Sequence, residues 1–400
     1  MKARTRTLVA AALVLGLTAG PVAAAQAVPS AAPSAPVSAG AASPVFSAPP
    51  DAEALRKAIA GVGPRNKDAT AALVRVGGTS GGWHGAAGVA DVRSGRPAVE
   101  EARFRAGSVT KTFTAAVVLQ LAAEGAVDLD RPVQDYLPGL LPGFEPVTVR
   151  QLLNYTSGLR SADGPGDAFE DEYAHRFDLV DPHALIANAV AKGPEFRPGE
   201  KQRYSNIHYT VLGVLIEKLT GASYERAVED RIIRPLGLRH TSFPARTQSR
   251  MPGPYNHGYQ AVAQADGSRT LVDVSDWNSS SNWAAGDLIS TTADLERFTV
   301  ALFGGRVVPR AQLEEMFTVP DVADADSGKH AVQTAGMKEF VLPDGTKLYG
   351  KTGSRYGYST VIGGTRDLSR TLVYSVNATD AKGREMNAVA YGIIGAAFAK

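Results

Sequence analysis

The sequence predicts an α/β (α+β) fold in which a sheet domain is interrupted by an all-helical insertion. Strand-like segments lie near both ends of the region 51–400, whereas residues from about 132 to 280 follow a helical pattern with long loops. Because a sheet must be covered by another layer, strands at both chain ends with helices between them favour one sheet packed against helices. The 400 residues, 44% of them hydrophobic, suffice for one large domain or two smaller ones.

The elements before the insertion follow from local patterns. After Asp51, apolar residues recur at helical spacing, which predicts a first helix. Residues 71–76 predict a strand, and residues 83–89, after a glycine-rich turn, predict its hairpin partner. A long and largely buried helix is then expected to begin at Ser108 and to end at Gly125.

The later elements show similar signals. Residues 149–154 and 208–219 predict helices within the insertion. Residues 337–342 and 346–352 flank a Pro-Asp-Gly turn, which predicts a hairpin. The remaining predicted elements are strands at 359–363 and 371–375 and a terminal helix within 386–400.

Residues 1–27 predict a secretory signal peptide. Three basic residues precede an apolar run that is short for a bilayer, and alanine-rich cleavage sites follow it. Residues 28–50 are rich in Ala, Pro and Ser, which predicts a flexible linker to the domain at 51–400. We expect export to the extracellular or cell-wall environment without a stable membrane anchor after cleavage. A retained anchor is the alternative. Because the chain has no cysteine, it can carry neither a lipoprotein anchor nor a disulfide.

Composition argues against two classes of function. The net charge of +2 does not favour a nucleic-acid binder, which normally has a clustered basic face. The seven histidines are scattered, with no H-x-x-x-H pair and no cysteine nearby, so a metal site is not expected.

The first chemical motif is S-x-x-K, formed by Ser108 and Lys111 at a helix start. This spacing places a hydroxyl and a potential base on one helix face. A helix N-terminus also offers free N–H groups to a developing oxyanion. The bland alternatives are a serine that only caps the helix and a lysine that is solvated. The apolar face around Lys111 favours burial instead, which would lower the pKa of its amine and make it a base.

Two further motifs follow in order. In the sequence Tyr204-Ser205-Asn206, the phenol could relay a proton and the amide could orient the lysine, although a turn asparagine beside a core tyrosine is the bland alternative. In the predicted strand carrying Lys351, Thr352 and Gly353, the glycine allows a substrate backbone to approach and pair with the edge. The N–H groups of Ser354 and Ser108 could form an oxyanion hole.

Ser80 forms a competing motif. Residues 78–82 fit G-x-S-x-G, which marks a nucleophile only between a strand and a helix. Here a second strand is expected to follow, so we interpret the segment as a hairpin turn.

Together the three motifs resemble those of the serine β-lactamase/D,D-peptidase family of the class C type. The likeness covers roughly 51–400, and the matching stretches include 104–108, 151–159, 197–199, 235–238 and 284–291. One departure is Tyr155, where the family often has histidine. The resemblance implies a mixed, mainly antiparallel sheet flanked by helices, with an all-helical domain and a cleft between them.

The resemblance also implies roles for the site residues. Ser108 would be the nucleophile, Lys111 the base and Tyr204 the proton shuttle. The implied substrate-binding residues are Asn206, Lys351, Thr352, Gly353, Ser354 and Trp283, the last as an aromatic wall of the cleft. No metal or cofactor is implied, and we expect a monomer.

Several activities share this mechanism. We favour a secreted D-alanyl-D-alanine carboxypeptidase acting on peptidoglycan stem peptides, because export without an anchor suits cell-wall peptides. A β-lactamase acting on β-lactams, an esterase and a D-amino-acid peptidase remain alternatives. A non-catalytic penicillin-binding or peptidoglycan-sensing module is less favoured, because all three motifs are intact.

Overall fold

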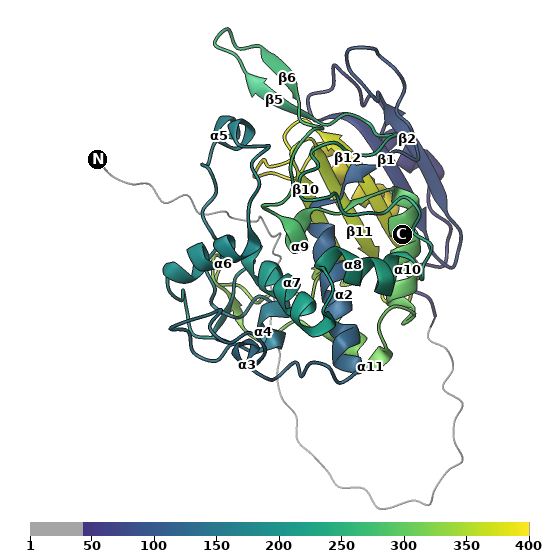
Figure 1. Ribbon diagram of the computed structural model, residues 1–400. Helices are drawn as coiled ribbons and strands as arrows, with labels where there is room; N and C mark the ends of the chain where they lie inside the picture. Colours follow the sequence, from purple (N-terminus) through teal and green to yellow (C-terminus); the bar gives the residue numbers. More distant parts are fainter. Residues whose placement is uncertain (1–42, 400) are drawn as a thin grey trace, which may run out of the picture.

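The structure, a computed structural model, describes residues 43–399 (Figure 1). The predicted signal and most of the predicted linker therefore lie outside the described residues. The central sheet has six strands in the order β2-β1-β12-β11-β10-β9, and every neighbouring pair is antiparallel. The strands of this sheet are β1 Ala69–Gly77, β2 Trp83–Gly88, β9 Lys338–Val341, β10 Lys347–Arg355, β11 Tyr358–Gly364 and β12 Thr371–Ala378.

The helices and short strands occupy the rest of the chain. The helices are α1 Ala52–Ala58, α2 Thr110–Ala123, α3 Val133–Tyr136, α4 Val149–Leu153, α5 Phe169–Ala174, α6 Pro182–Ala191, α7 Ile207–Thr220, α8 Tyr224–Val228, α9 Trp283–Gly286, α10 Thr292–Phe303, α11 Arg310–Leu313 and α12 Ala388–Ala397. The short turns are η1 Gly107–Val109, η2 Glu229–Ile233 and η3 Glu314–Met316. The short strands are β3 Phe104–Arg105, β4 Lys201–Gln202, β5 Tyr259–Ala263, β6 Arg269–Asp273, β7 Ile289–Ser290 and β8 Ala323–Asp324.

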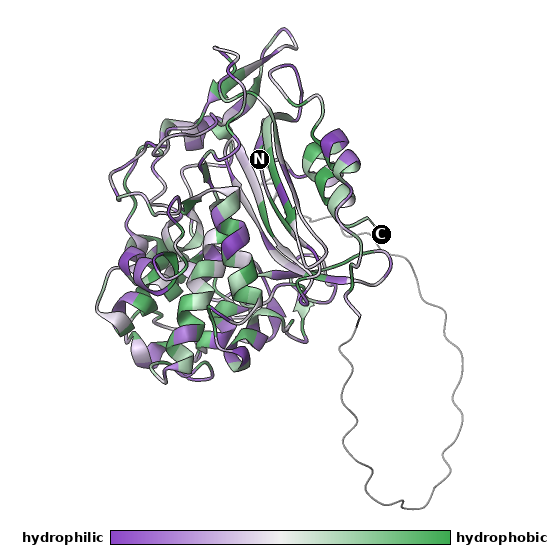
Figure 2. Ribbon diagram, turned by 90° about the vertical axis from the view of Figure 1, so that its right-hand side faces the viewer, coloured by the Kyte–Doolittle hydropathy of each residue, from purple (hydrophilic) through white to green (hydrophobic). Residues whose placement is uncertain are grey.

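Helices cover both faces of the sheet, as Figure 2 shows in an edge-on view. Alternate strand residues point to opposite faces, so Val373 packs toward α10 and α2, while Leu372 and Tyr374 pack toward α1 and α12. The predicted α/β fold with a mainly antiparallel sheet flanked by helices is confirmed. The strands expected at both chain ends pair directly, β1 with β12.

The helix α2 connects the sheet to the helical part of the molecule. It packs against α7 and α9 and is buried along most of its length. Helix α7 packs against α3, α4, α6 and α8, and α3, α4, α6 and α7 form the lobe at the lower left of Figure 1. Gly221, with φ +67°, ends α7 where the sequence predicts a stop. Within 43–399, no helix combines the length and apolar character needed to cross a bilayer.

The end of the predicted all-helical insertion is wrong in detail. Residues 259–273 form the β5–β6 hairpin, which projects from the sheet at the top of Figure 1. The N–H of Ala261 donates to the carbonyl of Thr379, just after β12, so the hairpin is joined to the sheet side of the molecule. Asp266 and Gly267 at its tip carry a usable turn signal, but strands of five residues are too short to outweigh the surrounding helical pattern.

The last part of the predicted linker belongs to the folded domain. Phe46 is buried against Phe398 and below the guanidinium of Arg370. Arg370 also donates a hydrogen bond to the carbonyl of Ala48. A single aromatic residue within the Ala/Pro/Ser pattern thus anchors residues 45–48 beside the sheet.

Candidate active site

Ser108 lies in the short turn η1, two residues before helix α2 begins at Thr110. Pairing of β3 with β7 fixes the approach of the chain, and the Ala106 N–H donates to the carbonyl of Leu288 at 2.8 Å. The hydroxyl of Thr110 donates to the carbonyl of Gly107 at 2.7 Å and closes the turn. Ser108 therefore stands at the N-terminal end of a buried helix, as the sequence predicts, but within a 3₁₀ turn.

Lys111 points into the protein and its amine has three close neighbours. Its Nζ lies 3.2 Å from Oγ of Ser108, 2.7 Å from Oδ1 of Asn206 and 2.7 Å from the carbonyl oxygen of Ala285. Burial, followed by the positive charges of Lys351 and Lys382, holds the pKa of Lys111 well below its usual value. A neutral amine donates two hydrogens and keeps one lone pair. The amide and carbonyl oxygens can take the hydrogens, which leaves the lone pair for the Ser108 hydroxyl.

Tyr204 and Asn206 reach the same point from the segment before α7. The Tyr204 ring centroid lies 5.1 Å from Nζ of Lys111 and 4.7 Å from Nζ of Lys351. Although 37% of Tyr204 remains exposed, the surrounding protein raises the pKa of its phenol, and a hydrogen bond with Ser108 only partly opposes this. The phenol therefore keeps its proton near neutral pH and can donate it.

Tyr155, the residue at which the sequence departs from the family, packs against the Tyr204 ring. Its fully buried ring lies 4.9 Å from the Tyr204 ring and 5.3 Å from the Tyr209 ring. Its backbone has φ +65°, which is rare for a bulky residue. A tyrosine at position 155 in place of histidine therefore changes the packing against Tyr204. The residues of the three motifs still lie close to one another.

The strand β10 brings the third motif to the site. Its partner β9 pairs only with Lys347–Gly350, so the edge from Lys351 onward has no strand partner in the described chain. Lys351 is only 4% exposed, and burial, followed by the charge of Lys338, lowers its pKa to about 7. Thr352 is exposed and, by strand alternation, points to the opposite face from Lys351. Because Lys351 and Thr352 lie on opposite faces of β10, they can contact the same ligand only where that ligand lies along the open edge of the strand.

Two glycines let η1 and β10 approach each other. A Cβ atom at Gly353 would lie 1.9 Å from the Ala106 carbonyl oxygen and 3.2 Å from the Ser108 nitrogen. A Cβ atom at Gly107, where φ is +53°, would lie 2.7 Å from the Ser354 nitrogen. The N–H groups of Ser108 and Ser354 are therefore neighbours, which is the arrangement that an oxyanion hole requires. The Ser354 hydroxyl is already bound to the carbonyl of Ala381, so only its N–H is available.

Comparison with known proteins agrees with this geometry. The pattern of the family described as Beta-lactamase matches residues 56–395. The chain belongs to the beta-lactamase family. This family of serine hydrolases includes penicillin-binding proteins, an esterase and D-amino acid amidases.

Curated relatives of this beta-lactamase-family protein match parts of their own length. A penicillin-binding protein of Bacillus subtilis is 28% identical over 308 residues, which are 74% of this chain and 65% of the relative. The esterase EstB of Burkholderia gladioli is 37% identical over 196 residues, which are 46% of this chain and 49% of the esterase. The chain thus spans about half to two thirds of these relatives.

Solved structures of the beta-lactamase family match more completely. A D-stereospecific amidohydrolase from Streptomyces sp. is 35% identical, with a TM-score of 0.75, and the match covers 87% of this chain and 99% of that one. A D-amino acid amidase from Ochrobactrum anthropi, complexed with L-phenylalanine amide, is 25% identical, with a TM-score of 0.73 and coverage of 86% and 97%.

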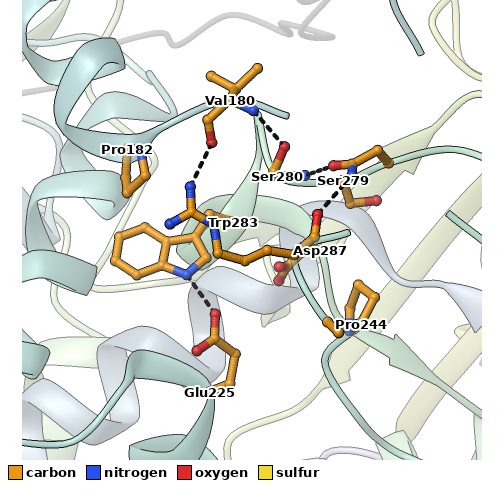
Figure 3. Close-up of a pocket in the computed structure, with 11 residues that line it drawn as sticks. Val180, Pro182, Glu225, Pro244, Ser279, Ser280, Trp283 and Asp287 are labelled. Carbon is orange, nitrogen blue, oxygen red and sulfur yellow. Dashed lines mark hydrogen bonds between the residues drawn. The ribbon is translucent and has the colours of Figure 1, made fainter. Parts of the chain in front are cut away.

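Trp283 is the predicted site residue that the structure does not bring to the others. It is 6% exposed, and its indole N–H donates to Oε1 of Glu225 at 2.8 Å. It lines a separate small pocket with Glu225, Ser280 and Asp287, and that pocket includes none of Ser108, Lys111, Tyr204 or Asn206 (Figure 3). The indole ring is thus mostly buried in the protein, and little of it is available as an aromatic wall of the cleft. Packing of the ring against Gly213 of α7 holds α9 in place instead.

Three further observations concern Ser80, the carbonyl of Ala285 and metal-binding side chains. Ser80 lies in the turn between β1 and β2 and donates to the carbonyl of Phe46, so the hairpin interpretation of that motif is confirmed. The carbonyl of Ala285 is a functional group that sequence reasoning missed, because a backbone acceptor leaves no residue-type signal. In residues 43–399 there is no group of three or more His, Asp or Glu side chains that could hold a metal ion.

Proposed function

We propose that this protein is a serine D-alanyl-D-alanine carboxypeptidase that acts on peptidoglycan stem peptides through an acyl-enzyme on Ser108. The observation that carries the proposal is the contact of the buried Lys111 amine with Oγ of Ser108, beside the buried Lys351 cation at an open strand edge. The first contact supplies an activated nucleophile, and the second supplies a position for a substrate carboxylate.

Acylation begins with proton transfer from the Ser108 hydroxyl to the neutral Lys111 amine. The freed oxygen attacks the scissile carbonyl carbon, and the N–H groups of Ser108 and Ser354 stabilise the negative charge that develops on the carbonyl oxygen. Tyr204 donates its phenolic proton to the leaving nitrogen and recovers a proton from Lys111. The C–N bond breaks, the terminal D-residue leaves as an amine, and the acyl group stays as an ester on Ser108.

Deacylation reverses these roles with water in place of the amine. The Tyr204–Lys111 pair accepts a proton from the attacking water, and the ester bond to Ser108 breaks. The shortened peptide leaves with a new carboxylate, and the serine regains its proton. Asn206 keeps the Lys111 amine oriented throughout, because its Oδ1 remains an acceptor for one amine hydrogen.

The carboxylate at the end of the peptide is the feature that Lys351 and Thr352 would recognise. A substrate laid along the open edge of β10 pairs its backbone with the strand. Its terminal carboxylate would then lie near Lys351 and Thr352, on one side of the oxyanion hole. The proposed cell-wall substrate also rests on the expected export of the chain.

A D-amino-acid amidohydrolase is the second candidate, favoured by the nearly complete match to the Streptomyces amidohydrolase. It would use the same chemistry on a substrate without the terminal carboxylate. A β-lactamase and an esterase differ from both in the leaving group and in how fast the acyl-enzyme hydrolyses.

Two measurements test the proposal. Intact-mass spectrometry with benzylpenicillin over time should show a persistent adduct on the wild-type protein. Hydrolysis of diacetyl-lysyl-D-alanyl-D-alanine should release D-alanine, and it should exceed hydrolysis of D-phenylalanine amide. Fast loss of the adduct with penicillin turnover would identify a β-lactamase. Preference for the amide would identify an amidohydrolase, and no adduct with ester hydrolysis alone would identify an esterase.

A further inference from the structure

The site continues beyond the oxyanion hole, in the direction opposite to Lys351. Along β10, Lys351 and Thr352 precede the Ser354 N–H, whereas Arg355 follows it and Tyr356 is the next residue, in the turn before β11. If the leaving carboxylate lies on the Lys351 side, as the proposed function has it, the acyl part of the substrate must lie on the Tyr356 side. This inference rests on the proposed function for that direction.

A loop after β12 borders this acyl side. The Ser354 hydroxyl binds the carbonyl of Ala381, so the next residue, Lys382, is held beside the end of β10. Lys382 is exposed as a residue, and its Nζ lies 5.9 Å from the Tyr356 ring centroid. The protein around the amine, followed by the charge of Arg355, lowers the pKa of Lys382 to about 8. Its charge is also felt at Lys111, where it contributes to lowering the pKa of the catalytic amine. Lys382 therefore stands at the cleft and close to the reacting groups.

Aromatic rings form a wall behind Lys382. The Tyr356 ring stacks on Trp277 at 5.0 Å and meets the edge of Phe169, from α5, at 5.1 Å. Tyr173, also from α5, contacts both Phe169 and Trp277. Three segments far apart in the sequence thus fix the position of Tyr356, which gives a rigid apolar surface for a ligand chain.

Charges of both signs meet at this end of the cleft. Arg355 is buried, and its Nε has no hydrogen-bond partner among the described residues. No ion pair within residues 43–399 joins Arg355 or Lys382 to a carboxylate, although Glu172 lies near enough to act on both and Asp287 also acts on Arg355. Glu170 and Asp380 act on the neighbouring Tyr356. Within residues 43–399 the Lys382 ammonium makes no hydrogen bond or ion pair, so it is available to a ligand carboxylate.

We propose that Lys382, with the ring of Tyr356 beside it, is a specificity-determining residue that binds a carboxylate on the acyl side of the substrate. The ligand class is an acyl donor that carries a carboxylate a few methylene groups from the scissile carbonyl. The methylene groups lie against Tyr356, and the carboxylate meets Lys382.

The test compares two esters with the same phenol leaving group, N-succinyl-D-alanine phenyl ester and N-acetyl-D-alanine phenyl ester. The succinyl group adds one methylene group and a carboxylate to the acetyl group. The wild-type protein should favour the succinyl ester by roughly tenfold or more in kcat/KM, as a charge-assisted contact implies. Lys382→Gln should bring this ratio close to one, because only the succinyl ester loses its carboxylate contact, whereas an effect through the pKa of Lys111 acts on both esters alike. Lys382→Glu should invert the preference. The matched control is Lys347→Gln, at the far end of β10 in an exposed ion pair with Glu339, and it should keep the wild-type ratio.

The outcomes separate this inference from the proposed function. A wild-type ratio near one, or equal loss of both esters in Lys382→Gln, would overturn the role of Lys382. Hydrolysis of the esters with the expected ratio, but no cleavage of a D-alanyl-D-alanine peptide, would overturn the carboxypeptidase and leave Lys382 supported. Turnover of neither ester would overturn both.

Discussion

The amine of Lys111 lies 2.7 Å from the side-chain oxygen of Asn206, although the two residues are 95 positions apart. This contact joins α2 to the start of α7, and the Ala285 carbonyl adds a third element at the same distance. Because both acceptors lack hydrogens of their own, they orient the amine and leave its lone pair toward Ser108. The base is therefore positioned by packing of three elements and not by the helix alone.

We expect covalent labelling to depend on Ser108 and not on Ser80. A fluorescent penicillin or fluorophosphonate should label the wild type and Ser80→Ala, and should fail on Ser108→Ala. The loss should reach several orders of magnitude in rate, as is usual when a nucleophile is removed. In-gel fluorescence measures it. Labelling that survives in Ser108→Ala and disappears in Ser80→Ala would reject the assignment.

Lys111→Arg should abolish acylation, because a guanidinium keeps its proton and does not fit the site of a neutral amine.

Tyr204→Phe should slow acylation by roughly 10²–10⁴-fold while the fold survives, as expected for a lost general acid–base group. Stopped-flow acylation and thermal unfolding measure the two effects. Normal acylation and deacylation in Tyr204→Phe would exclude the proton-shuttle role.

Thr352→Val should reduce hydrolysis of the D-alanyl-D-alanine peptide far more than hydrolysis of a phenyl ester. The valine keeps the shape of threonine, and the lost hydrogen bond to a carboxylate is worth about 1.5–3 kcal/mol. The kcat/KM values of both substrates in both proteins decide the matter. Equal loss on the two substrates would mean that Thr352 serves the strand or the oxyanion hole.

The pH profile should differ between substrates with and without a terminal carboxylate. The pKa of Lys351 is about 7 in the free protein, so its ammonium is charged below that pH and becomes neutral above it. The kcat/KM for the peptide should therefore fall by up to about tenfold per pH unit above pH 7, since this ratio reports groups of the free enzyme. The phenyl ester should not show that fall. Parallel profiles for both substrates would contradict a charged Lys351 anchor.

Gly353→Ala should remove activity by separating the two oxyanion donors. A Cβ atom there would lie 1.9 Å from the Ala106 carbonyl oxygen, so η1 and β10 must move apart. Loss of one donor commonly costs about 10²–10³-fold in kcat. Activity with a phenyl ester and circular dichroism measure the loss and the fold. Gly395→Ala, in α12 where nothing lies within 4 Å of the new atom and φ is not positive, is the control for general glycine effects.

Much of the fold could be predicted because its signals are local. The hairpin around the Pro-Asp-Gly turn, the stop of α7 at Gly221 and the burial of α2 depend on turn chemistry, a cap and an apolar pattern. The β5–β6 hairpin was missed because its strands are short. Residues 45–48 were missed because Phe46 is a single apolar residue in a linker-like stretch.

By itself, the sequence determined the order of the main elements, apart from the β5–β6 hairpin. It also determined the pairing of Ser108 with Lys111, because a spacing of three residues along a helix brings two side chains together. Only the tertiary structure decided that Asn206 and the Ala285 carbonyl meet the Lys111 amine, that Gly107 and Gly353 allow two N–H groups to converge, and that Trp283 lies in a separate pocket. These relations join elements distant in the chain. They depend on how whole helices and strands pack, which no local pattern encodes.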